Sequence, residues 1–398
     1  MIPQIDKEIG ISVYTTKSPS ISGKIKQNEN DFLVREILSE KTIDSFSNPD
    51  GHGVYLLKKS GIDTNHVLID IEKRYGLILK SLGLKDANAK TEQYVFTYKK
   101  INSLPEYTGK KYSAQRLGFV KKPISKKDML GNYFEIKVSE LSNALPSFTG
   151  GEKILNFFGY QRFGSKRPIT HLVGKSIIKG DYEEALEYLL NFSSKYDSEK
   201  NNEMRKLISE RKSETEVIEL LPYSMDIERN LLQQLSKNDD PKNAIRSIPL
   251  QLRRFYIQAY QSFLFNKTLS LANEFEENLF EPEIDDVCFD KNSLLGKFEN
   301  IPEQKLAVPL VGHSYYKKSR FDYYIKKILE EELLTPKDFF IKDFQELSVE
   351  GGFRNASINY VDFAIDNDLV KFQLSRGSYA TIVLREILKP ANPLDCGF

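Results

Sequence analysis

Residues 83–93 read Gly83-Leu84-Lys85-Asp86-Ala87-Asn88-Ala89-Lys90-Thr91-Glu92-Gln93, a polar stretch between a predicted helix and a predicted strand. The helix is expected over residues 64–75, where Thr64 can cap its start and apolar side chains recur at helical spacing. The strand is expected over residues 93–98, which are β-branched and aromatic. Loops on a rigid scaffold often carry chemistry, which makes Asp86 a candidate catalytic carboxylate. Its local pattern alone is more typical of a turn residue that accepts backbone N–H groups.

The segments around this loop predict strands at both ends of the chain and helices between them. Strands are expected at residues 22–26, 32–37, 54–59, 133–138, 369–374 and 379–384. Helical periodicity appears at residues 181–192, 200–221 and 250–272. This order predicts an α+β fold in which the C-terminus completes the sheet after a helical insertion at about residues 175–345.

Composition describes a folded protein that we expect in the cytoplasm. The chain has 398 residues, 40% hydrophobic and 28% charged, enough for one large domain or two. Its two cysteines, Cys288 and Cys396, form no CxxC motif, which argues against a zinc site or a disulfide framework. The N-terminus does not resemble a signal peptide, and no apolar run is long enough to span a membrane.

The net charge of +1 hides a polarised distribution. Residues 99–127 contain nine lysines and arginines against one acid, whereas residues 274–290 contain eight acids and no basic residue. A protein that binds RNA needs a local basic surface rather than a high total charge. From the basic segment we predict RNA contacts at Lys110, Lys111, Arg116, Lys121 and Lys122.

Three further segments leave alternatives open. Residues 156–164 place four aromatic residues among Asn, Gln and Arg, a pattern that suits a base-stacking pocket or an aromatic core equally well. Residues 374–381 contain Arg376-Gly377-Ser378, which locally favours a hairpin turn. Residues 261–266 are typical of a core helix interrupted by polar residues.

These pieces occur together in the TruD family of tRNA pseudouridine synthases, which the chain resembles. The resemblance rests on seven motifs in one order: Lys26-(x)4-Asp31-Phe32-(x)3-Glu36; Lys59-(x)4-Thr64; Gly83-x-Lys85-Asp86-(x)2-Ala89-x-Thr91-x-Gln93; Gly131-Asn132-x-Phe134; Asn156-x-Phe158-Gly159-x-Gln161-Arg162-Phe163-Gly164; Gln261-Ser262-x-x-Phe265-Asn266; and Arg376-Gly377-Ser378-Tyr379-Ala380-Thr381-(x)2-Leu384-Arg385-Glu386. Because they span nearly the whole chain, their joint occurrence outweighs the local interpretation of Asp86 as a turn residue.

The resemblance implies a pseudouridine synthase catalytic domain, a mixed and largely antiparallel sheet with flanking helices, interrupted by a mainly helical TRUD domain. We expect the catalytic domain at residues 1–174 and 346–398 and the insertion at residues 175–345. The family isomerises a tRNA uridine, typically position 13 in the D arm, without metal or cofactor. We expect tRNA as the partner and a monomer as the oligomeric state.

The same resemblance assigns the site residues. It implies Asp86 as the nucleophile, Lys26 as the active-site lysine, and Phe32, Asn156 and Phe158 as substrate-binding residues. Such an isomerisation breaks an N-glycosidic bond and rejoins the uracil through carbon. The reaction therefore needs at least one catalytic carboxylate. Asp86 either attacks C1′ of the ribose or removes the 2′ proton to give a glycal, and the sequence does not separate the two routes.

Two other functions remain to be compared with this one. A non-catalytic tRNA-binding protein or RNA chaperone could share the fold. A small-molecule lyase or glycosidase would need paired carboxylates, and Asp86 has no evident acidic partner within the motifs.

Overall fold

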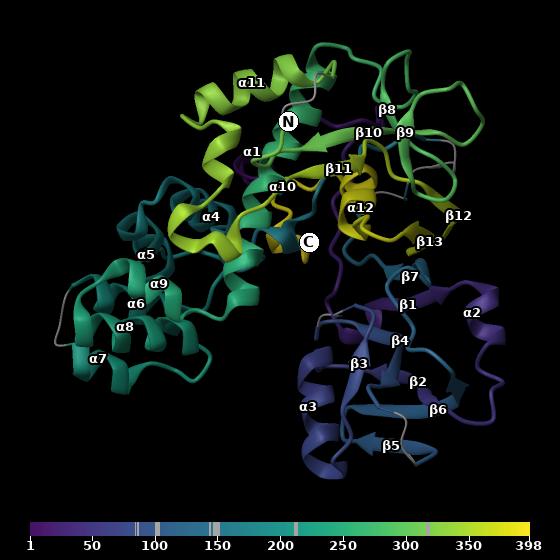
Figure 1. Ribbon diagram of the computed structural model, residues 1–398, viewed down its shortest axis with the longest axis horizontal. Coiled ribbons are helices and arrows are strands. Elements are labelled where there is room, and N and C mark those ends of the chain that lie inside the picture. Colours follow the sequence, from purple (N-terminus) through teal and green to yellow (C-terminus); the bar gives the residue numbers. More distant parts are fainter. Residues whose placement is uncertain are drawn as a thin grey trace.

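A nine-stranded sheet dominates the part of the chain that the structure describes (Figure 1). The structure is a computed structural model and describes residues 1–83, 85, 87–99, 104–142, 145, 152–210, 214–315 and 319–398. The strand order is β12-β13-β7-β1-β4-β2-β6-β5, with β3 paired to β4. The strands are β1 (Phe32–Leu38), β2 (His52–Lys59), β3 (Leu79–Ser81), β4 (Lys90–Thr97), β5 (Glu106–Gly109), β6 (Tyr112–Val120), β7 (Met129–Lys137), β12 (Tyr360–Asp366) and β13 (Leu369–Ser375).

The sheet is mixed and mostly antiparallel, as predicted. Among its described strands, only β1 and β4 pair in parallel, with Val34 opposite Thr91. Phe134 on β7 lies opposite Val34, and Phe372 on β13 lies opposite Phe134. Because residues opposite each other project to the same face, these four side chains form a row across the middle of the sheet.

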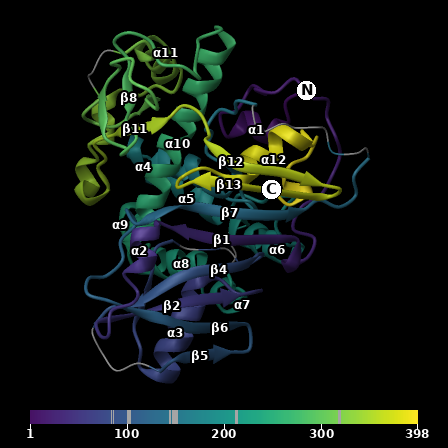
Figure 2. The same cartoon turned by 90° about the vertical axis from the view of Figure 1, so that its right-hand side faces the viewer.

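The same face is covered at its two ends by different helices. Helix α3 (Thr64–Tyr75) packs Val67 and Ile71 against Tyr55, Leu57 and Val95 at the β2–β6 end. Helix α12 (Ala380–Leu388) belongs to the larger core that includes Phe134 and Phe372. Figure 2 shows α3 and α12 toward opposite ends of the strand array. The sheet centre therefore lies between two helical supports.

Helices fill most of the predicted insertion. They are α4 (Thr170–Lys179), α5 (Tyr182–Leu190), α6 (Glu199–Ser209), α7 (Glu214–Leu220), α8 (Asp226–Asn238), α9 (Pro241–Ser247), α10 (Leu250–Glu274) and α11 (Asp322–Glu331). This region also contributes β8 (Val287–Phe289), β9 (Leu295–Lys297) and β10 (Lys305–Leu310), which form a second sheet with β11 (Gly352–Asn355) in the order β11-β10-β8-β9. Helix α4 continues through the boundary predicted at residue 174, and β10 pairs with β11 across residue 345. The exact domain boundaries stay predictions.

The remaining elements are short. Two further helices lie near the N-terminus, α1 (Gln4–Glu8) and α2 (Glu40–Asp44). Short 3₁₀ segments lie at η1 (Glu29–Asp31), η2 (Tyr160–Arg162), η3 (Pro336–Phe339), η4 (Lys342–Leu347) and η5 (Leu394–Cys396). No helix in the described ranges is both long and apolar enough to cross a membrane.

Most predicted elements are confirmed, and the exceptions have physical causes. The predicted strand at residues 379–384 is wrong, because most of this segment belongs to helix α12. Every residue of α12 is buried, so the helix is surrounded by protein. A short apolar run gives no periodicity that separates a buried strand from a buried helix. The predicted strand at residues 22–26 is reduced to a bridge between Lys24 and Ser139. The stretch 200–221 divides into α6 and α7, and the cap of α3 is Asp63 rather than Thr64.

Candidate active site

A cavity of about 220 Å³ opens over the middle of the sheet, between Lys85, Ala89 and Thr91 on one side and the start of α12 on the other. Its walls come from five separate stretches of chain. The lining residues are Lys26, Phe32, Val34, Lys85, Ala89, Thr91, Asn132, Phe134, Gln161, Ser378, Tyr379, Ala380 and Thr381. A larger hollow of about 640 Å³ lies on the helical region between α4 and the 337–343 segment, and it contains no residue of the seven motifs. Five of the seven motifs therefore contribute residues to the smaller cavity.

Two predicted site residues, Lys26 and Phe32, meet in this cavity. The Nζ atom of Lys26 lies 4.7 Å from the centre of the Phe32 ring. Lys26 has a left-handed backbone with φ of 58°, an uncommon conformation for a residue with a side chain. The turn before β1 thus directs a cation and an aromatic ring to the same place.

Asp86 lies outside the described residues, but the residues that precede it are held by hydrogen bonds. The backbone N–H of Lys85 donates to Oγ1 of Thr64 over 3.0 Å, and the backbone N–H of Thr64 donates to the Lys85 carbonyl over 3.3 Å. Gln93 accepts from the Thr64 hydroxyl over 2.8 Å and donates to the Gly83 carbonyl over 3.1 Å. Thr64 and Gln93 are completely buried, so α3 and β4 hold the residues just before Asp86.

The side chain of Lys85 gives this loop a third anchor. Its ammonium group lies 3.1 Å from Oε1 of Glu36 and donates to Oδ1 of Asn132 over 2.9 Å. The other Glu36 oxygen accepts from the Tyr94 N–H over 2.9 Å. Burial raises the pKa of Glu36, and the charge of Lys85 opposes that rise. Lys85 is therefore held to β1 by a largely buried ion pair and to β7 by a hydrogen bond.

Asn156 and Phe158, predicted to bind substrate, lie behind the cavity rather than among its lining residues. Their exposed fractions are 4% and 6%. The backbone N–H and carbonyl of Phe158 bond to the side-chain amide of Asn266 on α10, over 2.8 and 3.1 Å. The Phe158 ring packs at 6.1 Å from the ring of Tyr379, which does line the cavity. Direct substrate contact by Asn156 and Phe158 stays a prediction.

Tyr379 and Thr381 form the wall opposite β1 and are held by the segment at residues 159–162. The Thr381 hydroxyl donates to Oε1 of Gln161 over 3.2 Å. A Cβ atom on Gly159 would lie 2.9 Å from both Thr381 Oγ1 and Tyr379 Cδ1. Only glycine therefore lets the two segments approach this closely.

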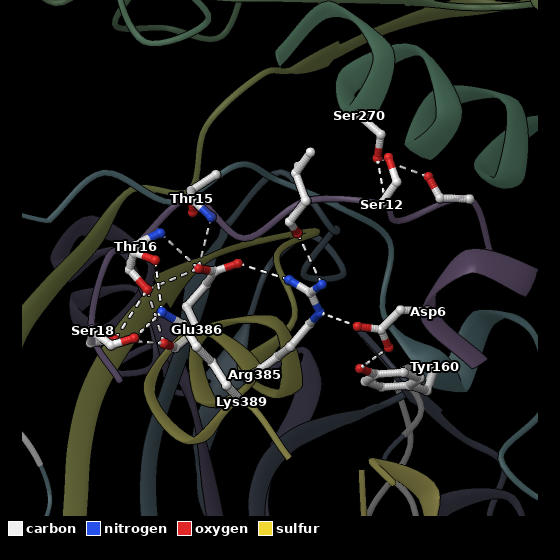
Figure 3. Close-up of polar contacts among 12 residues, drawn as sticks. Asp6, Ser12, Thr15, Thr16, Ser18, Tyr160, Ser270, Arg385, Glu386 and Lys389 are labelled. Atoms are coloured by element: carbon white, nitrogen blue, oxygen red, sulfur yellow. Dashed lines mark hydrogen bonds and ion pairs between the residues drawn. The ribbon is translucent and has the colours of Figure 1, made fainter. Parts of the chain in front are cut away.

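A buried polar network fixes both wall segments to the N-terminus (Figure 3). Asp6 accepts from the Tyr160 hydroxyl over 2.7 Å and from Nε of Arg385 over 2.6 Å. Arg385 also pairs with Glu386 over 2.8 Å, and all three charged side chains are fully buried. Glu386 accepts the N–H groups of Thr15 and Thr16, each over 3.0 Å.

The predicted RNA contacts do not form a single patch. Lys110 and Lys111 precede β6, whereas Lys121 and Lys122 follow it, and all four are exposed. At about 3.3 Å per residue, β6 separates the two pairs by roughly 25–30 Å. Lys111 donates to the Gly61 carbonyl, close to the turn that leads to Thr64. Arg116 lies within β6, with its guanidinium carbon 4.8 Å from the centre of the Phe119 ring.

Several residues that line the cavity or hold its walls carried no role in the sequence analysis. Asn132, Gln161, Tyr379 and Thr381 line it, and Glu36, Thr64 and Gln93 hold the residues before Asp86. All seven belong to the quoted motifs, so the signal was present without an assignment. Within the ranges that can be described, no group of three or more His, Cys, Asp or Glu side chains could hold a metal ion. Independence of metal and cofactor stays a prediction.

Comparisons with known proteins agree with the motifs. The family model described as "tRNA pseudouridine synthase D (TruD)" matches residues 8–387. A protein of Pyrobaculum neutrophilum described as "Probable tRNA pseudouridine synthase D" is 31% identical over 100% of this chain and 99% of its own length. One from Methanococcoides burtonii with the same description is 30% identical over 98% of each chain.

The fold comparison leads to the same family. The crystal structure of the putative tRNA pseudouridine synthase D from Methanosarcina mazei superposes with a TM-score of 0.76, at 26% identity and 99% coverage of both chains. The chain therefore belongs to the TruD family of tRNA pseudouridine synthases, a class of isomerases.

Proposed function

We propose that the protein isomerises a uridine in the D arm of tRNA to pseudouridine, with Asp86 as the nucleophile. The observation that supports this most directly is the cavity that joins Lys26 and Phe32 to the residues flanking Asp86. Lys85 precedes Asp86 and Ala89 follows it closely, and both line the cavity wall. The nucleophile loop therefore borders a cavity that already contains a cation and an aromatic ring.

The electrostatics of the cavity suit an ionised aspartate. A carboxylate must be charged to attack C1′ or to remove the 2′ proton, and nearby cations favour the charged form. Lys26 lines the cavity, and the charge of Lys85 is already neutralised in large part by Glu36. We therefore assign the partner role to Lys26 and a positioning role to Lys85.

The free uracil must be held while it turns between the two bonds to ribose. Aromatic faces can stack on a base without fixing one of its edges. Phe32, Phe134 and Tyr379 line the cavity and offer such faces, while Asn132 and Gln161 offer amide groups. A uridine in folded tRNA must leave its stack to enter, at a cost of about a few kcal/mol.

Replacement of Asp86 by Asn tests the nucleophile. The variant keeps the shape of the side chain and should bind tRNA normally while forming no pseudouridine, as measured by mass-spectrometric mapping of the tRNA. Asp50→Asn is the matched control, because Asp50 is an exposed carboxylate in the bend before β2. Full activity of the Asp86 variant would refute the assignment.

A tRNA transcript with cytidine at position 13 tests the D-arm assignment. The product of the unaltered transcript should carry pseudouridine at this position, and the altered transcript should carry none elsewhere in the D arm. Modification of another arm in both transcripts would contradict the proposed target.

Two paired lysine variants test the RNA surface. Lys110→Gln with Lys111→Gln neutralises the pair that borders the Gly61 turn, and Lys121→Gln with Lys122→Gln neutralises the pair at the other end of β6. Each lysine that binds a phosphate contributes about 0.7–0.9 to the slope of log affinity against log salt, so its neutralisation should lower the slope by that amount. A wild-type slope in both double variants would remove this segment from the tRNA interface.

A further inference from the structure

Arg354, on β11, has an unusual environment for a half-buried cation. Its guanidinium carbon lies 3.9 Å from the centre of the Phe158 ring. Nε donates to the backbone carbonyl of Asn156 over 3.1 Å, and Nη2 donates to Oδ1 of Asn156 over 2.8 Å. The third nitrogen, Nη1, has no protein acceptor among the described residues and points toward Gly377, where a Cβ atom would lie 3.6 Å from it.

A second arginine approaches the same ring. The guanidinium carbon of Arg162 lies 5.4 Å from the centre of Phe158 and 5.2 Å from that of Phe255. Its Nε donates to the hydroxyl of Ser262 over 3.2 Å, and its two terminal nitrogens have no acceptor within the described chain. The unbonded terminal nitrogens of Arg354 and Arg162 are also not among the fully buried polar atoms of the described residues. They are therefore accessible to solvent.

Neither arginine has a carboxylate partner in the part of the chain that is described, which separates them from Arg385 and Arg205. Arg385 pairs with Asp6 and Glu386, and Arg205 pairs with Asp197 and Glu228. Burial lowers the pKa of Arg354 to about 10, and the charge of Arg162 acts in the same direction. Two like charges near one ring, without a counterion, favour an anion that enters from solvent.

The position of the pair identifies the kind of anion. The guanidinium carbon of Arg354 lies 6.0 Å from the ring of Tyr379, and Tyr379 and Ser378 line the cavity. A nucleotide whose base occupies the cavity carries its phosphates beside the cavity wall. Guanidinium groups with free donors bind phosphate oxygens in a bidentate geometry.

We propose that Arg354 and Arg162 bind a backbone phosphate of the RNA strand next to the target uridine. This rests on the proposed function only in that the cavity receives the flipped base. The stacking of Arg354 on Phe158 also gives the aromatic residue a role: it holds the cation at a fixed angle while one edge stays open to the ligand.

The test measures tRNA binding over a range of salt concentrations for Arg162→Gln and Arg354→Gln. Arg74→Gln is the control, because Arg74 is exposed and already paired with Asp70 over 3.0 Å. Each site variant should bind tRNA about tenfold more weakly, with the salt slope reduced by about 0.7–0.9, while the control keeps the wild-type slope. Arg162→Gln removes a single hydrogen bond to the protein, so it serves as the test if Arg354→Gln fails to fold.

A tRNA with one neutral methylphosphonate linkage beside the target uridine completes the experiment. It should weaken binding to the wild-type protein more than binding to either single arginine variant, because each variant has already lost one of the two phosphate contacts. Equal weakening for wild type and variants, or wild-type salt slopes in both, would overturn the phosphate site. Binding needs no turnover, so an active Asp86→Asn variant would refute the nucleophile without affecting this result.

Discussion

The ion pair between Lys85 and Glu36 offers the sharpest test of how the nucleophile loop is held. The side chains are 11% and 0% exposed, and their charged atoms lie 3.1 Å apart. At an effective dielectric constant of about 20, this separation corresponds to about 5 kcal/mol of attraction. Removing both charges from water costs several kcal/mol each, so the intact pair contributes little net stability.

Removing only one partner of the pair should lower the unfolding free energy by much more than the intact pair contributes. Lys85→Met keeps the length of the side chain but leaves Glu36 charged, buried and without its cation. Breaking a buried pair in this way costs about 3–5 kcal/mol of unfolding free energy. Activity should fall about 100-fold as well, because a displacement of about 1 Å in a reacting group has that effect.

The cost should depend on pH in a defined direction. Burial raises the folded-state pKa of Glu36, and loss of Lys85 removes the main opposing charge, so the pKa rises further. A carboxyl group with a raised folded-state pKa binds its proton more tightly in the folded protein than in the unfolded one. Stability is therefore lost as pH rises through that pKa, and the Lys85→Met deficit should be smaller at pH 5 than at pH 8.

Thermal and urea unfolding at the two pH values provide the measurement. Lys58→Met is the matched control, since Lys58 pairs with Glu92 over 3.4 Å but is 54% exposed, and its loss should cost at most about 1 kcal/mol. Adding Glu36→Gln to Lys85→Met should recover most of the stability. A Lys85→Met deficit no larger than that of the control, or larger at pH 5, would refute the reasoning.

Two further changes test the walls of the cavity. Arg385→Met leaves Asp6 and Glu386 without their cation in a completely buried site. The free energy of unfolding should fall by about 3–5 kcal/mol, with a strong drop in melting temperature. A fall of under about 1 kcal/mol would contradict a stabilising role of this network. Gly159→Ala presses a methyl group against Tyr379 at 2.9 Å, so pseudouridine formation should fall more than stability does, which kinetics and melting curves together would show. An unchanged rate would mean that this wall does not position the substrate.

The sequence predicted the sheet better than it predicted the opposite wall of the cavity. Strands β1, β2 and β7 follow clear alternation or β-branched composition, and the helix at α3 follows its spacing. Helix α12 was predicted as a strand because Thr381, Ile382 and Val383 favour strands locally. Its helical form depends on burial on all sides and on Asp6, which lies 379 residues away from Arg385 in the chain.

The candidate site shows the same division between local and distant information. Lys26 and Phe32 were predicted to share a site and they line one cavity, because both belong to one turn and the strand that follows it. Arg354 belongs to none of the motifs, and no local pattern indicated it. Its environment comes from Asn156 and Phe158, which are brought to it only by tertiary packing.

The helical region is joined to the cavity through α10 rather than simply attached beside it. Asn266 accepts from the backbone N–H of Phe158 and donates to the carbonyls of Phe158 and Ile9. One buried amide thus connects the helical region, the segment behind Tyr379 and the N-terminal turn that carries Asp6. A long insertion adds little to the cost of closing the chain, since each doubling of loop length costs only about 0.6 kcal/mol. Removing it, however, would leave the Phe158 N–H and carbonyl unsatisfied in the interior, so the catalytic sheet and the helical region form a single structural unit at this point.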